Sequence, residues 1–290
     1  MTIKNVENIT INGNGAGLTV DSTGYTGVTK LTVGDSATGA VSVTASTTTA
    51  VTASSTGATG TVSISGGSTQ NATTGAAVTL SGAVGAITAS SSALAAGTSA
   101  INGGTSVSYT ASGETSGTIT VGASTAPTGA VVISTTSASA GTNAMGAIAV
   151  TGGTTVSVTQ TRGNVVATTD TMGTVTVTGS ANTTGVTVTN SAIATASATV
   201  SGVVANTIAV NDVNTASTTK AGTITSVTAS NFTTLTVAGT ALTTLSATGG
   251  SGNITVTNSG LTTPTNKTLA LTLDGQTAGN FADTNITGQC

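Results

Sequence analysis

The residues that could carry acid–base or metal chemistry are few in this chain of 290 residues. It contains no His, and its single Cys, Cys290, is the final residue. Without an imidazole, neither a Ser–His nor a Cys–His nucleophile pair can form, and nothing marks one Ser or Thr as activated. The carboxylates are spread over the chain, at Glu7, Asp21, Asp35, Glu114, Asp170, Asp212, Asp274 and Asp283. We therefore expect no catalytic site and no enzyme activity.

Calcium binding is the chemistry that best suits this set of carboxylates. Calcium takes 6–8 oxygen ligands and accepts backbone and amide carbonyls, so each site needs few carboxylates. Four aspartates stand at turns beside predicted strands: Asp35 in VGDS, Asp170 in TTDTMG, Asp212 in VNDVN and Asp274 in LDGQ. The alternative is that each aspartate caps its own turn through its backbone. We predict calcium ligands at these positions and leave turn capping open.

Two further kinds of site are weighed against the same residues. Arg162 near Asp170 could indicate a polysaccharide lyase, but sugar clefts usually contain aromatic platforms, and aromatic residues make up 1% of the chain. Thr-x-Thr pairs such as Thr174/Thr176 and Thr187/Thr189 could form an ice-binding face. That face needs a constant rung length, and the spacing between strands in the sequence drifts. Both readings stay minor alternatives.

The elements that must position these residues are short strands of period 2. In TVTVTG (174–179), Val175 and Val177 fall on one face and the threonines on the other. Similar strands recur throughout, many entered from a Gly and separated by Gly, Asn, Ser and Thr. No helical period of 3.6 competes over any length. The strands are spaced irregularly, which favours rungs of unequal loop length over an exact repeat.

The composition agrees with a β-solenoid. Hydrophobic residues make up 37% of the chain and charged residues only 4%, against about 25% charged in an ordinary domain. Val, Ile and Thr favour strands and argue against disorder, and a narrow core of small side chains suits stacked rungs. We predict an all-β, irregular right-handed parallel β-helix, or β-solenoid, as one continuous segment over residues 1–290. An array of β-sandwiches is the alternative.

The charge pattern and the amino terminus limit partners. The net charge is −3, and the basic residues are scattered, so we expect no nucleic-acid partner. No apolar run is long enough for a membrane helix, so we expect no direct membrane insertion. The opening MTIKNVENITING lacks the apolar stretch of a signal peptide. An export signal would then lie elsewhere in a longer protein, and Cys290 would mark a fragment boundary.

Several stretches resemble one known family. GAIAVTGGTTVSVTQTRGN (146–164) and TVTVTGSANTTGVTVTNSAIATASATVSG (174–202) are very similar to the calcium-dependent, type I-secreted (RTX-type) S-layer proteins of the Caulobacter kind. More loosely, so are TASTTKAGTITSVT (215–228) and the opening VENITINGNGAGLTVDSTGYTGVTKL (6–31). The resemblance covers most of the chain and is weakest at 66–115. Its motifs are of low complexity, and the ordered run 146–202 is the part that carries it.

This resemblance implies an extracellular protein of the bacterial cell surface that folds on calcium and tiles with copies of itself into a lattice. The chain would be an interior part of its solenoid, and anchoring to the cell would belong to parts outside this chain. Of the four aspartates, only Asp212 falls at a turn where the family also places one. The alternatives are an RTX-like adhesin or biofilm matrix stalk and, less favoured, an ice-binding or phage tail-fibre β-helix.

Overall fold

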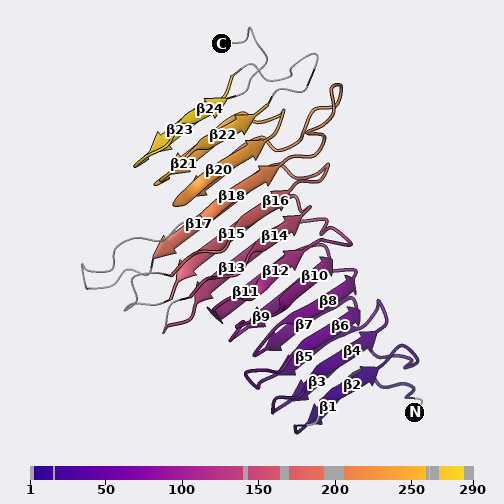
Figure 1. Ribbon diagram of the computed structural model, residues 1–290. Coiled ribbons are helices and arrows are strands. Elements are labelled where there is room, and N and C mark those ends of the chain that lie inside the picture. The colour runs from indigo at the N-terminus through magenta and orange to yellow at the C-terminus, as the bar shows by residue number, and fades with distance from the viewer. Residues whose placement is uncertain are drawn as a thin grey trace.

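The computed structural model describes residues 3–15, 17–139, 143–163, 170–192, 206–258, 261 and 268–283. These residues form β-strands joined by turns and no helix, arranged as two long sheets that run the length of the molecule (Figure 1). Every strand pair within the two sheets is parallel, and each sheet contains 12 strands. The prediction of an all-β parallel β-helix is thereby confirmed.

The odd-numbered sheet consists of β1 (Asn8–Gly13), β3 (Lys30–Asp35), β5 (Ala50–Ser55), β7 (Thr69–Thr74), β9 (Ile87–Ser91), β11 (Val107–Glu114), β13 (Val131–Ser137), β15 (Thr155–Arg162), β17 (Gly185–Ala192), β19 (Ser226–Ser230), β21 (Thr244–Thr248) and β23 (Ala270–Asp274). The even-numbered sheet consists of β2 (Leu18–Asp21), β4 (Val41–Ala45), β6 (Val62–Gly66), β8 (Val78–Ala83), β10 (Thr98–Gly103), β12 (Thr118–Val121), β14 (Ile148–Thr151), β16 (Val175–Thr178), β18 (Asn206–Asn211), β20 (Phe232–Ala238), β22 (Ile254–Thr257) and β24 (Phe281–Asp283).

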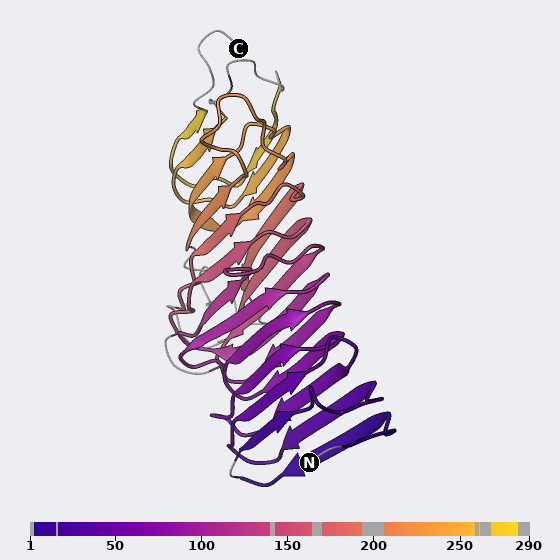
Figure 2. The same cartoon turned by 90° about the vertical axis from the view of Figure 1, so that its right-hand side faces the viewer.

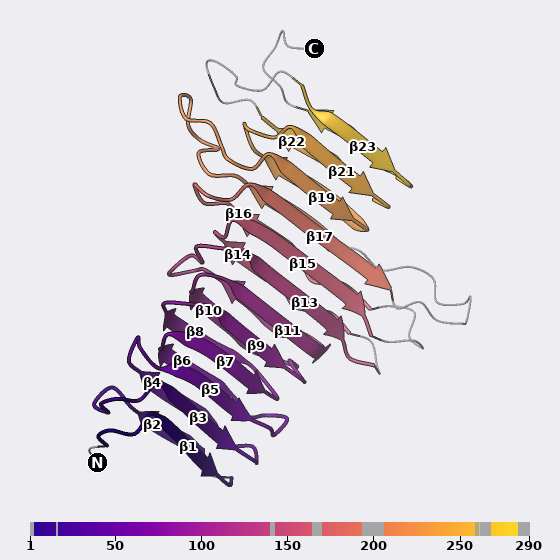
Figure 3. The ribbon, with the colours of Figure 1, turned by 180° about the vertical axis from the view of Figure 1, so that it is seen from behind.

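One rung of the solenoid consists of one odd strand and the even strand that follows it. The chain alternates between the two sheets, so that each strand pairs with the strand two places earlier and two places later (Figure 3). Ile9 on β1, for example, lies beside Leu31 on β3, which lies beside Val51 on β5. Each rung therefore extends both hydrogen-bond ladders, and stability accumulates along the axis of the rod.

The turns absorb the unequal length of the rungs. Thr73 and Ser90 occupy neighbouring rungs and are 17 residues apart in the chain, whereas Asn190 and Asn231 are 41 residues apart. The strand registers nevertheless continue from one rung to the next along the whole sheet, with shifts at only a few strand ends. The irregular spacing seen in the sequence thus belongs to the loops and leaves the sheets in alignment.

The core is a narrow apolar layer between the two sheets, which face each other in the side view of Figure 2. In β16 the burial alternates residue by residue, with Val175 and Val177 buried and Thr176 and Thr178 exposed. Nearly all of the remaining strands, in both sheets, follow this pattern with Val, Ile, Leu or Ala inward. The predicted alternation at 174–178 is confirmed, and only Tyr109 and Phe232 supply fully buried aromatic rings.

Polar side chains form one edge of this core. The inward position near the end of the odd strands carries a column that begins Asp35, Ser55, Thr74 and Ser91 and continues, after Ala111, through Thr135, Gln160 and Asn190. Burial of such groups is tolerated when they are hydrogen-bonded. The amide nitrogen of Gln70, near the start of β7, meets that condition by donating to the carbonyls of Gly66 and Ser81, both at 2.7 Å, whereas its Oε1 has no partner among the described residues.

Two further features bear on the rod as a whole. None of the residues placed in the structure forms a helix with the length and hydropathy needed to cross a membrane. In the last described rung, Leu271 and Leu273 are each 40% exposed, although they continue two inward columns whose preceding members, Leu245 and Ala247, are completely buried.

Candidate functional site

The four aspartates predicted as calcium ligands lie in separate rungs. Asp35 ends β3, Asp170 precedes β16, Asp212 follows β18 and Asp274 ends β23. Within the described ranges no group of three or more His, Cys, Asp or Glu side chains comes together as a metal centre would require. Among the described residues, calcium bound at one of these four aspartates would therefore need carbonyl and hydroxyl oxygens to complete its ligands.

Asp35 closes the turns of two successive rungs. Its Oδ1 accepts hydrogen bonds from the N–H groups of Ala37 at 2.8 Å and Gly15 at 3.2 Å, and its Oδ2 accepts one from Gly17 at 3.2 Å. The Ala37 N–H contributes most to lowering the pKa of Asp35 below its ordinary value, burial opposes it, and the two glycines add to the lowering. In this structure the carboxylate is surrounded by donors, as in turn capping.

Asp212 has the same kind of environment at the opposite edge of the rod. Its Oδ1 accepts the N–H of Val213 at 2.7 Å, and its Oδ2 accepts the N–H groups of Thr223 at 2.8 Å and Ile224 at 2.9 Å. These bonds tie the start of the long connection after β18 to its end. Asp212 thus stabilises the loop between β18 and β19, which contains no strand.

Asp170 and Arg162 form a buried pair rather than an open cleft. The Asp170 carboxylate accepts the hydroxyl of Ser137 at 2.7 Å and the backbone N–H of Asn143 at 3.0 Å. Arg162 Nε lies 3.9 Å from Asp170 Oδ2, and the two side chains are 1% and 0% exposed. None of the three guanidinium nitrogens has a hydrogen-bond partner among the described residues. Because the pair is enclosed, a polysaccharide cannot reach it in this conformation.

Asp274 differs from the other three. It lies on the outer surface of β23, where it continues a column above Thr248, and it is exposed. Its backbone carbonyl accepts the N–H of Gly249, and no described residue donates a hydrogen bond to its carboxylate. Of the four predicted ligands, Asp274 is the one whose carboxylate is left for solvent.

Glu114 is a buried carboxylate that we did not single out from the sequence. It ends β11 beyond a shift in register and is completely buried. Burial raises its pKa to about 7, against the opposing hydrogen bond from the N–H of Gly146 to Oε1 at 2.8 Å. The Thr135 hydroxyl weakly favours the ionised form, although its placement does not satisfy hydrogen-bond geometry. Only the bulge at Gly113 turns this residue inward, which strict alternation does not reveal.

The outer face of the odd-numbered sheet carries two columns of small polar residues. The first outer rank is Thr10, Thr32, Thr52, Asn71, Thr88, Ser108, Val132, Ser157, Thr187, Thr228, Ser246 and Thr272. The second outer rank is Asn12, Gly34, Ser54, Thr73, Ser90, Thr110, Ser134, Thr159, Thr189, Ser230, Thr248 and Asp274. Neighbouring members stand one strand spacing apart, about 4.8 Å. Asp274 is the single charged residue in either rank.

These ranks correct one expectation drawn from the sequence. The irregular strand spacing argued against stacked Thr-x-Thr pairs, yet Thr187 and Thr189 stack directly on Ser157 and Thr159. Thr174 and Thr176 do not belong to this face, because Thr176 lies on the outside of the even-numbered sheet between Ala149 and Ala209. The loops take up the difference in length, so the face stays regular.

No family model matches this chain, and a search of curated proteins found no match.

Proposed function

We propose that this chain is a structural segment of an extracellular bacterial surface layer, in which the solenoid is stabilised by calcium and packs side by side with copies of itself. Catalysis has no part in this proposal. The resemblance of residues 146–202 to the RTX-type S-layer proteins is its starting point, and the architecture described above supports it.

The continuous double ladder is the observation that carries the proposal. Two parallel sheets of 12 strands run through the described residues in sequence order. A parallel strand buried in such a stack cannot slide or open without breaking the ladders on both sides. A rod of this kind resists deformation along its length, which suits a wall or stalk.

The outer faces suit lateral packing. Apart from Asp274, the two outer ranks hold small uncharged side chains, and only Val132 among them is a large exposed hydrophobic residue, at 47%. Away from Lys30 and Asp274, two faces of this kind can approach closely without burying an unpaired charge, which would oppose association. A second copy of the chain is therefore the partner that we propose.

Calcium enters the proposal through folding free energy. A core of Val, Ala and Ile with few large side chains buries modest apolar area per rung and therefore gains modest folding free energy. A ligand that binds only the folded chain adds to that stability by mass action. Among the predicted ligands, Asp274 is the one whose exposed carboxylate can bind an ion without first losing hydrogen bonds to described residues. Asp35, Asp170 and Asp212 would have to exchange N–H or O–H donors for the ion.

Electron microscopy of the purified chain with excess calcium and with EDTA tests this function. We expect ordered two-dimensional sheets with calcium and dispersed rods with EDTA. Rods that stay dispersed at every calcium concentration would instead favour the adhesin or biofilm-stalk alternative. A thermal unfolding temperature that is the same in calcium and EDTA would remove calcium from the proposal.

The regular outer ranks give the ice-binding alternative a specific observation in its favour. Two adjacent columns of hydroxyl-bearing residues, held in constant register, present a repeating flat surface to water. Thermal hysteresis measured on the purified chain separates this reading from a purely structural one. Growth of ice crystals with no hysteresis would exclude it.

A further inference from the structure

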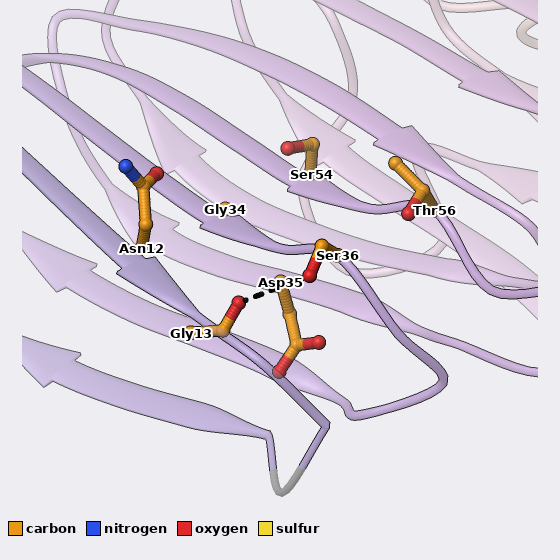
Figure 4. A pocket seen from close by; sticks show the side chains of 7 residues that line it. All are labelled: Asn12, Gly13, Gly34, Asp35, Ser36, Ser54 and Thr56. Atoms are coloured by element: carbon orange, nitrogen blue, oxygen red, sulfur yellow. Dashed lines mark hydrogen bonds between the residues drawn. The ribbon is translucent and has the colours of Figure 1, made fainter.

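The second outer rank is interrupted at one place by a position without a side chain. Gly34 on β3 stands between Asn12 on β1 and Ser54 on β5, and every other member of the rank carries a side chain. The interruption leaves a surface hollow of about 260 Å³, lined by Asn12, Gly13, Gly34, Asp35, Ser36, Ser54 and Thr56 (Figure 4).

The backbone does not require a glycine at this position. Gly34 is absent from the residues with positive φ, so its conformation is open to any residue. A Cβ placed on it would meet Ser54 Oγ at 3.2 Å and Asn12 Oδ1 at 3.5 Å, both at the ends of side chains that can rotate. A glycine inside a strand weakens the strand, and it often marks a place where a ligand approaches the backbone closely. Close approach of a ligand is the explanation that fits Gly34.

The groups around the hollow are polar and neutral. The Asn12 amide and the Ser54 and Thr56 hydroxyls form no side-chain hydrogen bond with any described residue, so their donors and acceptors are available. The Ser36 hydroxyl donates to the Gly13 carbonyl at 3.4 Å. Asp35 is the single charged residue of the lining, and its carboxylate turns away from Asn12 and Ser54 toward the N–H groups of Gly15, Gly17 and Ala37 (Figure 4).

This set of groups selects a ligand class. Amide and hydroxyl groups each both donate and accept hydrogen bonds, as the hydroxyl groups of a sugar do. The lining includes no Lys or Arg for a phosphate or carboxylate, and no aromatic ring for a nucleobase. The volume is slightly below the range of about 300–1,000 Å³ typical of pockets for drug-sized ligands, which limits the occupant to one ring.

We propose that the hollow at Gly34 is a binding subsite for a single neutral sugar residue. The ring lies over the bare backbone of Gly34, and its hydroxyls bond to Asn12 on one side and to Ser54 and Thr56 on the other. The site is open and has no aromatic platform, so binding is weak for a free monosaccharide. This proposal does not depend on lattice formation, because the hollow is complete within the first rungs of one chain.

Amide chemical-shift mapping by NMR, with a panel of neutral methyl glycosides added to the full chain, tests this site. We expect one or more of them to shift the backbone amides of residues 12–13, 34–36 and 54–56, with saturable dependence on concentration. Methyl glucuronide serves as the charged comparison, and we expect it to bind more weakly because no cation lines the hollow. No saturable shift with any glycoside, or shifts confined to other rungs, would overturn the proposal.

Two variants connect the shifts to the hollow. Gly34→Thr continues the rank and fills the space, and we expect it to abolish the saturable shifts while thermal unfolding stays the same or rises. Asn12→Ala empties one side and should weaken binding several-fold. Ser134→Thr places a threonine in the same rank away from the hollow and should bind like the parent chain. Equal binding by Gly34→Thr and the parent chain would refute the site.

Discussion

The hydroxyl of Tyr109 lies 2.7 Å from the hydroxyl of Ser99, so a hydrogen bond crosses the core from β11 in one sheet to β10 in the other. The same Tyr109 oxygen lies 2.8 Å from Ser91 Oγ on β9. Three residues of three strands thus share one buried polar junction, which joins the two sheets across the core. Burial raises the pKa of Tyr109 above its ordinary value, while the two serines oppose that rise, so the phenol stays protonated near neutral pH.

Replacing Tyr109 with Phe should destabilise the rod by about 1–3 kcal/mol, because two buried serine hydroxyls lose their hydrogen bond to the phenol while the ring is kept. The free energy of unfolding in urea measures the effect. Tyr25→Phe is the matched control, since Tyr25 is only partly buried and its hydroxyl forms no hydrogen bond with the described residues. Equal stability of Tyr109→Phe and the parent chain would show that the junction contributes nothing.

Glu114 should make the rod less stable as the pH rises. Its pKa is raised from 4.5 to about 7 in the folded chain, so the folded state holds the proton more tightly than the unfolded state. The contribution to stability is complete below about pH 4.5 and is lost as the pH passes through about 7, and it amounts to at most about 3 kcal/mol. The free energies of unfolding in urea of the parent chain and of Glu114→Gln, compared from about pH 4.5 to above pH 7, measure this contribution.

Glu114→Gln keeps an oxygen for the Gly146 N–H and cannot ionise, so its stability should be flatter with pH over this window. Asp21→Asn is the control, because Asp21 is an exposed carboxylate bonded to Thr23 in its own turn. Parallel pH profiles for the parent chain and Glu114→Gln would contradict the assignment.

Asp212 and Asp274 should respond differently to substitution. Asp212→Ala removes the acceptor of three backbone N–H groups at the ends of one loop, and we expect a loss of about 2–3 kcal/mol in EDTA and in calcium alike. Asp274→Asn removes an exposed charge and should leave stability in EDTA unchanged while reducing the increase caused by calcium. Calorimetric unfolding temperatures in the two buffers give both quantities. A calcium response that disappears in Asp212→Asn but persists in Asp274→Asn would reverse the assignment.

The alternation of β-branched residues was enough to predict the fold where it is strong. Val175 and Val177 point inward as their spacing indicated. It was not enough for β7, TQNATT, whose inward residues are Gln70, Ala72 and Thr74. That strand forms because β5 and β9 offer ladders on both sides, and because the carbonyls of Gly66 on β6 and Ser81 on β8 accept hydrogen bonds from the Gln70 amide nitrogen.

The sites were harder to predict than the fold. The sequence placed Asp35 and Asp212 at turns, which is where they lie, but it did not reveal their donors. Asp35 also accepts hydrogen bonds from Gly15 and Gly17 of the preceding rung, and Asp212 accepts two from the far end of its own loop. Gly34 gave no signal in a chain with 39 glycines. Only the strand register shows that Gly34 stands between two residues with side chains, Asn12 and Ser54, in the second outer rank.

Arg162 and Asp170 should differ sharply in the cost of their removal. The Asp170 carboxylate accepts hydrogen bonds from Ser137 and Asn143 and lies beside Arg162, so Arg162→Met leaves a carboxylate that still has donors. It also removes a buried guanidinium whose nitrogens have no acceptor in the described part of the chain, and we expect stability to stay the same or rise. Asp170→Ala leaves that guanidinium buried without any counter-charge and should cost about 3–5 kcal/mol. The double variant Arg162→Met/Asp170→Asn should recover most of this loss, because it removes both charges together. Unfolding free energies of the three variants form the test, and equal losses for the two single variants would mean that the pair contributes as a symmetric salt bridge.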